Sequence, residues 1–159
     1  MLTLRKANNL GDAEILAEHN CAMAMETESK SLNFDVVKSG VLGLLERPEY
    51  GFYLVAEMET GEGRDVAATL TVTYEWSDWR NGLFWWVQSV YVKSHYRRQG
   101  VYRAMYEYLQ TESKQSEIPV CGFRLYVETQ NFAAQKTYAD CGMGECDYLM
   151  FEQLLGHTG

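Results

Sequence analysis

The sequence is poor in the features that mark membrane, secreted and nucleic-acid-binding proteins. No apolar run approaches the roughly 18 residues that cross a bilayer, and the N-terminal residues lack the apolar core of a signal peptide. Basic residues number 14 against 22 acidic ones, and the net charge of −8 argues against a nucleic-acid surface, which needs basic patches. We therefore expect a cytoplasmic protein with no membrane or nucleic-acid partner.

Cysteine and histidine are too scattered to indicate a metal site. The three histidines have no ligand-like spacing to a cysteine, and the four cysteines include no CxxC pair. Since no export signal is visible, we expect reduced structural thiols and no bound metal. The cysteines are Cys21, Cys121, Cys141 and Cys146.

What is present is apolar material for a core. The 159 residues are 47% hydrophobic and 13% aromatic, which is enough to bury a core without disulfides or metals. Repeats, low-complexity stretches and linkers are lacking. The chain is therefore predicted to form one domain over residues 1–159.

Apolar periodicity in the first third predicts one strand followed by two helices. Asn9 or Asp12 is expected to cap the first helix, and Asn33 or Asp35 the second, which stops before Pro48. The expected ranges are 2–7 for the strand, up to about residue 28 for the first helix, and from residue 33 or 35 for the second.

From Gly51 onward the period changes to that of strands. A loop with the sequence ETGEGRD and a hairpin at Asn81-Gly82 divide this region into an antiparallel meander of three strands. A helix, a strand, a helix opened by Asn131 and ended at Cys141-Gly142, and a last strand follow. The expected strands are 52–57, 66–76, 83–92, 122–127 and 147–154, and the third helix is 100–114.

The stretch from Val87 to Leu109 predicts a strand, a basic glycine turn and an amphipathic helix. Such a junction directs free backbone N–H groups and the positive end of a helix dipole at one point, where a pyrophosphate can bind. Four basic residues fall here within eleven residues that include no acid: Lys93, Arg97, Arg98 and Arg103. From charge alone, a solvated basic helix start remains an equal alternative.

The segment Arg97-Arg98-Gln99-Gly100 resembles the acetyl-CoA signature of the GNAT superfamily of N-acetyltransferases. That pattern is Gln or Arg, two residues, Gly, one residue, then Gly or Ala, and Tyr102 departs from it at the last position. A second segment, Asn131 to Met143, is similar to the one that follows in the same superfamily, with Tyr138 seven residues after the asparagine. The resemblance implies an α/β (α+β) fold, a mixed central sheet of about six to seven strands flanked by four helices.

The resemblance also implies which residues bind acetyl-CoA. Backbone groups of Val90, Tyr91 and Val92 would pair with the pantetheine amides, where their strand splays from the strand at 122–127. Backbone N–H groups of the glycine turn would hold the pyrophosphate, with Arg97 and Asn131 as matching motif positions. The turn donors are Arg98, Gln99, Gly100, Val101 and Tyr102.

Acetyl transfer to an amine needs a neutral nucleophile, stabilisation of the carbonyl oxygen and a proton for the leaving thiolate. By resemblance, Tyr138 is the general acid and the Val90 N–H polarises the thioester; an ordinary packing role for Tyr138 is the alternative. Where many relatives have a glutamate base, this chain has Gln88, which cannot accept a proton but can orient water or the acceptor. Glu26 and Glu28 are therefore the candidate bases, unless they are simply solvated.

The sequence thus predicts an N-acetyltransferase acting on a small amine or amino-acid-like acceptor in a ternary complex. A non-catalytic acyl-CoA-binding module on the same fold is the alternative, favoured by Gln88 and Tyr102. Trp85 and Trp86 must face opposite sides of the sheet, so at most one lines an acceptor pocket while the other serves packing or an oligomer surface. The acceptor and the existence of a homodimer stay open.

Overall fold

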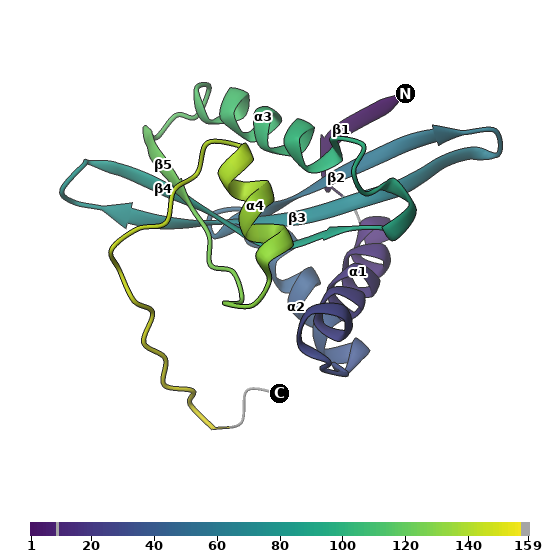
Figure 1. Cartoon of the computed structure of the whole chain (residues 1–159), viewed down its shortest axis with the longest axis horizontal. Helices are drawn as coiled ribbons and strands as arrows, with labels where there is room; N and C mark the ends of the chain where they lie inside the picture. Colours follow the sequence, from purple (N-terminus) through teal and green to yellow (C-terminus); the bar gives the residue numbers. More distant parts are fainter. Residues whose placement is uncertain (9, 157–159) are drawn as a thin grey trace. The chain divides into compact units, whose positions relative to one another are not determined.

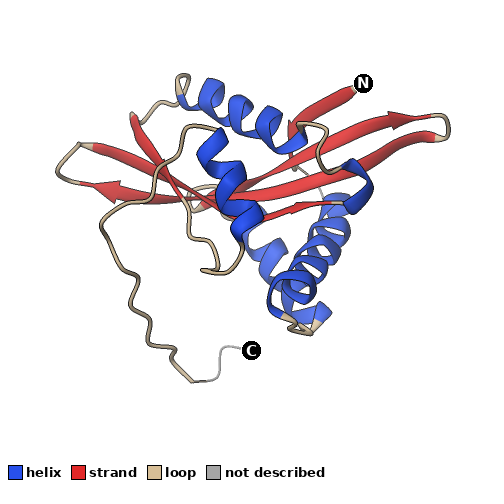
Figure 2. Ribbon diagram, viewed as in Figure 1, coloured by secondary structure: helices blue, strands red, loops and turns tan. Residues whose placement is uncertain are grey.

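The computed structural model describes residues 1–8 and 10–156. By its internal contacts the chain divides into two compact units, Met1–Tyr126 and Val127–Gly159. Figure 1 labels the helices and strands, and Figure 2 colours them by type.

The first unit is built on one sheet of five strands in the order β1-β2-β3-β4-β5. Neighbours from β1 to β4 pair antiparallel, and β5 pairs parallel to β4. The strands are β1 (Leu2–Lys6), β2 (Gly51–Thr60), β3 (Gly63–Ser77), β4 (Gly82–Val92) and β5 (Val120–Arg124). The helices are α1 (Leu10–Glu28), α2 (Phe34–Leu45), the short 3-10 turn η1 (Ser94–Tyr96) and α3 (Val101–Ser113).

The mixed α/β class and the predicted meander are confirmed, but the predicted loop ETGEGRD is mostly strand. Glu59 pairs with Arg64 and Thr60 with Gly63, so β2 and β3 continue almost to the tip of their hairpin. Turn residues tolerate this extension because each added cross-strand pair satisfies backbone N–H and C=O groups. The hairpin therefore needs only a tight turn.

Helices cover both faces of this sheet (Figure 1). On one face, α1 and α2 pack against β2, and their shared core includes Leu16, Val41 and Val55. On the other face, α3 places Tyr106 edge-on to Phe123 of β5, whose ring meets Trp85 of β4. The apolar sides of the helices thus enclose the sheet between two layers.

The predicted helix caps are only partly confirmed. Asn33 caps α2, because its side chain accepts from the backbone N–H groups of Asp35 and Val36. Asn9 lies outside the described residues. Asp12 is not a simple cap: its carboxylate accepts two hydrogen bonds of 2.8 Å from Arg5, and Arg5 also donates to Glu57. This hydrogen bonding holds the pKa of Asp12 below its usual value.

The second unit contains α4 (Phe132–Asp140) followed by an extended segment. Asn131 caps α4 by accepting from the Ala134 N–H, and Gly142 has a φ of 91°, as the predicted left-handed helix terminus requires. The predicted last strand, 147–154, is wrong: this segment forms no strand in the described part of the chain. Alternating apolar residues become a strand only where a neighbour offers backbone partners, so the sheet has five strands, not six or seven.

All four cysteines are free thiols. No helix among residues 1–8 and 10–156 has both the length and the apolar composition needed to cross a membrane. Within the same residues, no three His, Cys, Asp or Glu side chains cluster as metal ligands would.

Gly51 at the start of β2 is predicted to be the glycine least tolerant of a side chain. A Cβ there would overlap the backbone carbonyl oxygen of Val72 on β3, and neither strand can move without breaking its pairing. We expect Gly51→Ala to lower the free energy of unfolding by about 2 kcal/mol or more, measured by urea titration.

The matched control for Gly51→Ala is Gly40→Ala in the exposed part of α2, where a Cβ would meet nothing within 4 Å. Because alanine favours helix over glycine, this variant should gain up to about 1 kcal/mol. Equal stability of the two variants would show that β2 and β3 are not packed this closely at Gly51.

Candidate active site

A β-bulge interrupts β4 just before its end. Thr69 of β3 pairs with Tyr91 and Thr71 pairs with Gln88, so Ser89 and Val90 together lie opposite one residue of β3. Ser89 has a φ of 50°, a left-handed conformation that costs a non-glycine residue energy. Bulges of this kind redirect backbone groups, and they are common next to active sites.

From residue 87 onward, β4 has no strand partner on its β5 side in the described part of the chain. Its parallel pairing with β5 stops at Trp86, opposite Arg124, where β5 ends. In the described part of the chain, residues 87–92 therefore pair with β3 alone. The resemblance implies a splay here against a strand at 122–127; the observed strand ends already at Arg124, which leaves Val90, Tyr91 and Val92 on an edge that an extended ligand can join.

The turn after β4 forms a concave set of backbone donors. Arg98 and Gly100 have φ angles of 62° and 77°, and Gly100 is the N-cap of α3. Within the described residues, the N–H groups of residues 98–101 donate to no protein acceptor. Left-handed residues alternating with others make an anion-binding nest, and the helix dipole adds positive potential at the same place.

Tyr102, which departs from the signature, does not extend into solvent. Its side chain belongs to the buried face of α3, and its ring stacks on Tyr106 with a centroid separation of 6.3 Å. The backbone N–H of Tyr102 therefore lies in the first turn of α3, while its side chain packs on the buried face of the helix.

The structure brings four of the predicted site residues together from two distant parts of the chain. Arg97 pairs with Glu26 at the end of α1 over 2.6 Å and donates from Nε to the Val92 carbonyl oxygen over 2.8 Å. Tyr91 donates its hydroxyl to the second oxygen of Glu26 over 3.3 Å, and the Arg97 guanidinium lies near the Tyr91 ring. The side chain of Arg97 thus fastens the glycine turn to α1.

Two candidate catalytic residues of the first unit, Glu28 and Gln88, lie apart from this cluster. Glu28 pairs with Lys30, two residues further along the chain. Gln88 lies half-buried opposite Thr71, just before the bulge. Only Gln88 of these two is next to the free edge of β4.

His19 on α1 is a buried histidine that the sequence analysis does not place in the site. Its side chain is only 3% exposed, its Nδ1 lies 3.0 Å from the Thr69 hydroxyl, and its ring contacts Tyr91. Burial, with a smaller effect of Lys93, lowers its pKa to about 4, while Asp65 opposes the shift. A neutral imidazole therefore supports the strand pair that carries the bulge.

The lowered pKa predicts a pH dependence of stability. Between pH 6.5 and about 4 the unfolded chain binds a proton at His19 that the folded chain does not bind, so stability falls as the pH is lowered. The expected slope is up to about 1.4 kcal/mol per pH unit in this window, measured by urea titration at several pH values. His19→Asn, which keeps a group able to bond to Thr69, should lose this slope; a variant with the wild-type slope contradicts the assignment.

Two predicted residues belong to the second unit. Asn131 is used as the cap of α4, and Tyr138 lies on that helix. Burial raises the pKa of the Tyr138 hydroxyl above its ordinary value. The hydroxyl is therefore protonated at neutral pH, as a proton donor must be.

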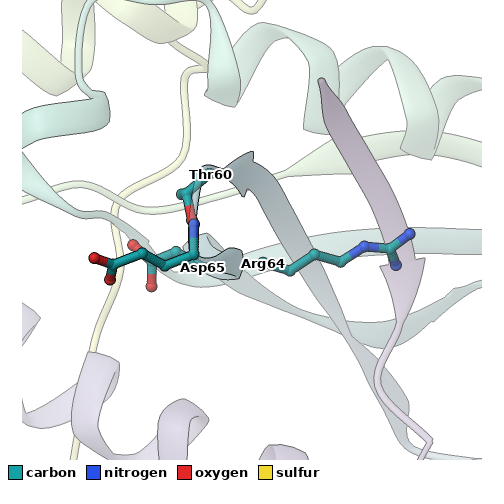
Figure 3. A pocket seen from close by; sticks show the side chains of 5 residues that line it. Thr60, Arg64 and Asp65 are labelled. Carbon is teal, nitrogen blue, oxygen red and sulfur yellow. The ribbon is translucent and has the colours of Figure 1, made fainter.

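A hollow of about 650 Å³ lies at the turn between β2 and β3 (Figure 3). Its lining residues are Thr60, Gly61, Glu62, Arg64 and Asp65. None of them was predicted for the site, and the Asp65 carboxylate is already paired with Lys93 over 2.6 Å. We interpret the hollow as the concave side of an exposed hairpin turn.

Comparison with known proteins shows the family of the chain. The model of the acetyltransferase (GNAT) family matches residues 15–143. A solved structure, "a possible acetyltransferase from Clostridium difficile 630", is 41% identical, covers 99% of each chain and superposes with a TM-score of 0.85. No curated protein sequence matches significantly.

Two more distant structures share the fold. A "predicted acetyltransferase with acetyl-CoA from Clostridium acetobutylicum" is 17% identical over the full length of both chains, with a TM-score of 0.76. Glucosamine-6-phosphate N-acetyltransferase from Arabidopsis thaliana is 21% identical over 96% of this chain and 98% of its own, with a TM-score of 0.70. With a family model that covers most of its length, the chain belongs to the acetyltransferase (GNAT) family.

Proposed function

We propose that the protein transfers an acetyl group from acetyl-CoA to a primary amine of a small or amino-acid-like acceptor, by direct attack in a ternary complex. The observation that carries this proposal is the continuity of two features: the free, bulged end of β4 and the nest of N–H groups that follows it. One ligand with an extended amide chain and a pyrophosphate fits both. The activity is compatible with the cytoplasmic location expected from the sequence.

The pantetheine amides would pair with Val90, Tyr91 and Val92 at the free edge of β4. The pyrophosphate would accept hydrogen bonds from N–H groups of residues 98–102, at the positive end of the α3 dipole. Arg97 would act mainly as a positioning residue, because its guanidinium is already engaged with Glu26 and Val92. Asn131 would act through its cap on α4.

In the reaction, the amine nitrogen attacks the thioester carbonyl carbon, the C–S bond breaks, and CoA leaves as a thiolate. The Val90 N–H would stabilise the oxygen as it gains charge. Tyr138 would protonate the thiolate, which is a fair leaving group with a pKa near 8.5. The products are the acetylated amine and free CoA.

The amine must also lose a proton, at a cost of about 4 to 5 kcal/mol for a pKa of 10.4 at neutral pH. Of the candidate bases, Glu26 is held by Arg97 and Glu28 by Lys30. We propose that a water oriented by Gln88 carries the proton away, with Glu26 positioning the turn. Glu28 remains the alternative acceptor of that proton.

A non-catalytic acyl-CoA-binding module is the second candidate, and Gln88 is the observation that favours it. Calorimetric titration with acetyl-CoA is expected to show binding under both proposals. Release of free CoA thiol in the presence of primary amines separates them: thiol release supports the enzyme, and binding without release from any amine favours the module.

A further inference from the structure

A strip of partly exposed side chains runs from Gln88 along β4 toward its start and continues to Tyr126, just after β5. Thr69 contacts His19 of α1, which identifies the α1 face of the sheet. Since side chains alternate along strands, Thr71 and its partner Gln88 lie on that same face, and so does Trp86 two residues before Gln88. We call Gln88, Trp86 and Tyr126 the acceptor strip.

Aromatic surface dominates this strip. The Trp86 ring lies 6.2 Å from the ring of Tyr126, and Tyr126 is 60% exposed. Trp85, in contrast, is buried on the opposite face among Phe52, Tyr74 and Phe123. Of the two neighbouring tryptophans, Trp86 is thus the one available to a ligand beside Gln88.

Negative charge near the strip is already neutralised. Glu75, on the same face of β3, pairs with Arg124, whose guanidinium covers Phe84 at 3.7 Å. At the other end, Glu26 pairs with Arg97 and Glu28 with Lys30. A second ammonium group on an acceptor would have to compete with Arg124, Arg97 or Lys30 for these three carboxylates.

We propose that the acceptor is a monoamine with an aromatic body, whose ring packs on Trp86 and Tyr126 while its amine lies at Gln88. Residues two apart on one face of a strand are about 7 Å apart, which matches an amine separated from an aromatic ring by a short alkyl chain. Stacking of rings favours this class over aliphatic polyamines and amino sugars. The inference rests on the proposed acetyl transfer, because that places the reacting carbonyl at Val90.

The first test compares kcat/KM for thiol release among 2-phenylethylamine, tryptamine, spermidine and glucosamine at fixed acetyl-CoA. The two aromatic amines are expected to exceed the others by at least about tenfold. Equal or better use of spermidine or glucosamine overturns the inference while leaving acetyl transfer intact. Thiol release with none of the amines, together with acetyl-CoA binding, overturns the proposed function itself.

The second test uses Trp86→Ala, which should raise KM for tryptamine about tenfold and leave the KM for acetyl-CoA unchanged. Trp86→Phe should have a KM for tryptamine close to that of the wild type. Trp86→Met, which keeps the volume without an aromatic face, should have a KM raised as much as in Trp86→Ala. Trp79→Ala is the matched control, since Trp79 is 84% exposed in the β3–β4 turn. A tryptamine KM that is the same in wild type, Trp86→Ala and Trp86→Met contradicts the proposal.

Discussion

Gly100→Glu is expected to lower the affinity for acetyl-CoA by at least about 100-fold, a loss of about 2.7 kcal/mol. Gly100 begins α3 with a φ of 77°, and an added Cβ would meet nothing within 4 Å. The side chain therefore has room, and its carboxylate would stand where the pyrophosphate is proposed to bind. Repulsion between the two anions is the cause of the expected loss.

The control for this variant is Gly100→Gln, which has nearly the same size and the same left-handed strain but no charge. Calorimetric titration should show that it retains much of the affinity that the glutamate variant loses. If Gly100→Glu keeps the wild-type affinity for acetyl-CoA, the assignment of this turn as the pyrophosphate site is wrong. Equal losses in both variants would point to backbone strain and not to an anion site.

Tyr138→Phe is expected to reduce kcat about 100-fold, within the range of general acid catalysis. Burial raises the pKa of the Tyr138 hydroxyl, which stays protonated at neutral pH, and phenylalanine keeps the ring and lacks only the hydroxyl group. Affinity for acetyl-CoA should change by less than about threefold, because one hydrogen bond contributes little net free energy. Steady-state thiol release and calorimetry measure the two effects separately.

Tyr50→Phe is the matched control, because Tyr50 is exposed between α2 and β2 and has no predicted part in the reaction. It should have the wild-type kcat. An unchanged kcat in Tyr138→Phe removes Tyr138 from the acid role, while a large change in both variants would show that the assay responds to general loss of hydroxyl groups.

Local signals predicted much of the fold. The Asn33 and Asn131 caps and the left-handed Gly142 follow from interactions within a few residues of the chain, and the turn signals between β2, β3 and β4 predicted their meander. The same is true of the glycine turn. The prediction failed where the local signal needed a distant partner. Residues 147–154 alternate between apolar and polar side chains like a strand, but they have no partner strand in the described part of the chain.

The sequence by itself predicted an anion-binding turn between a strand and a helix, because β4, the Arg97 to Gly100 turn and α3 are contiguous and the geometry of the turn is local. Only the tertiary structure decided that Arg97 holds Glu26, 71 residues away, that His19 is buried under Tyr91, and that Trp86 lies on the α1 face. These facts depend on strand register and on the packing of α1 against the sheet. Long-range contacts of this kind have no period that a single sequence displays.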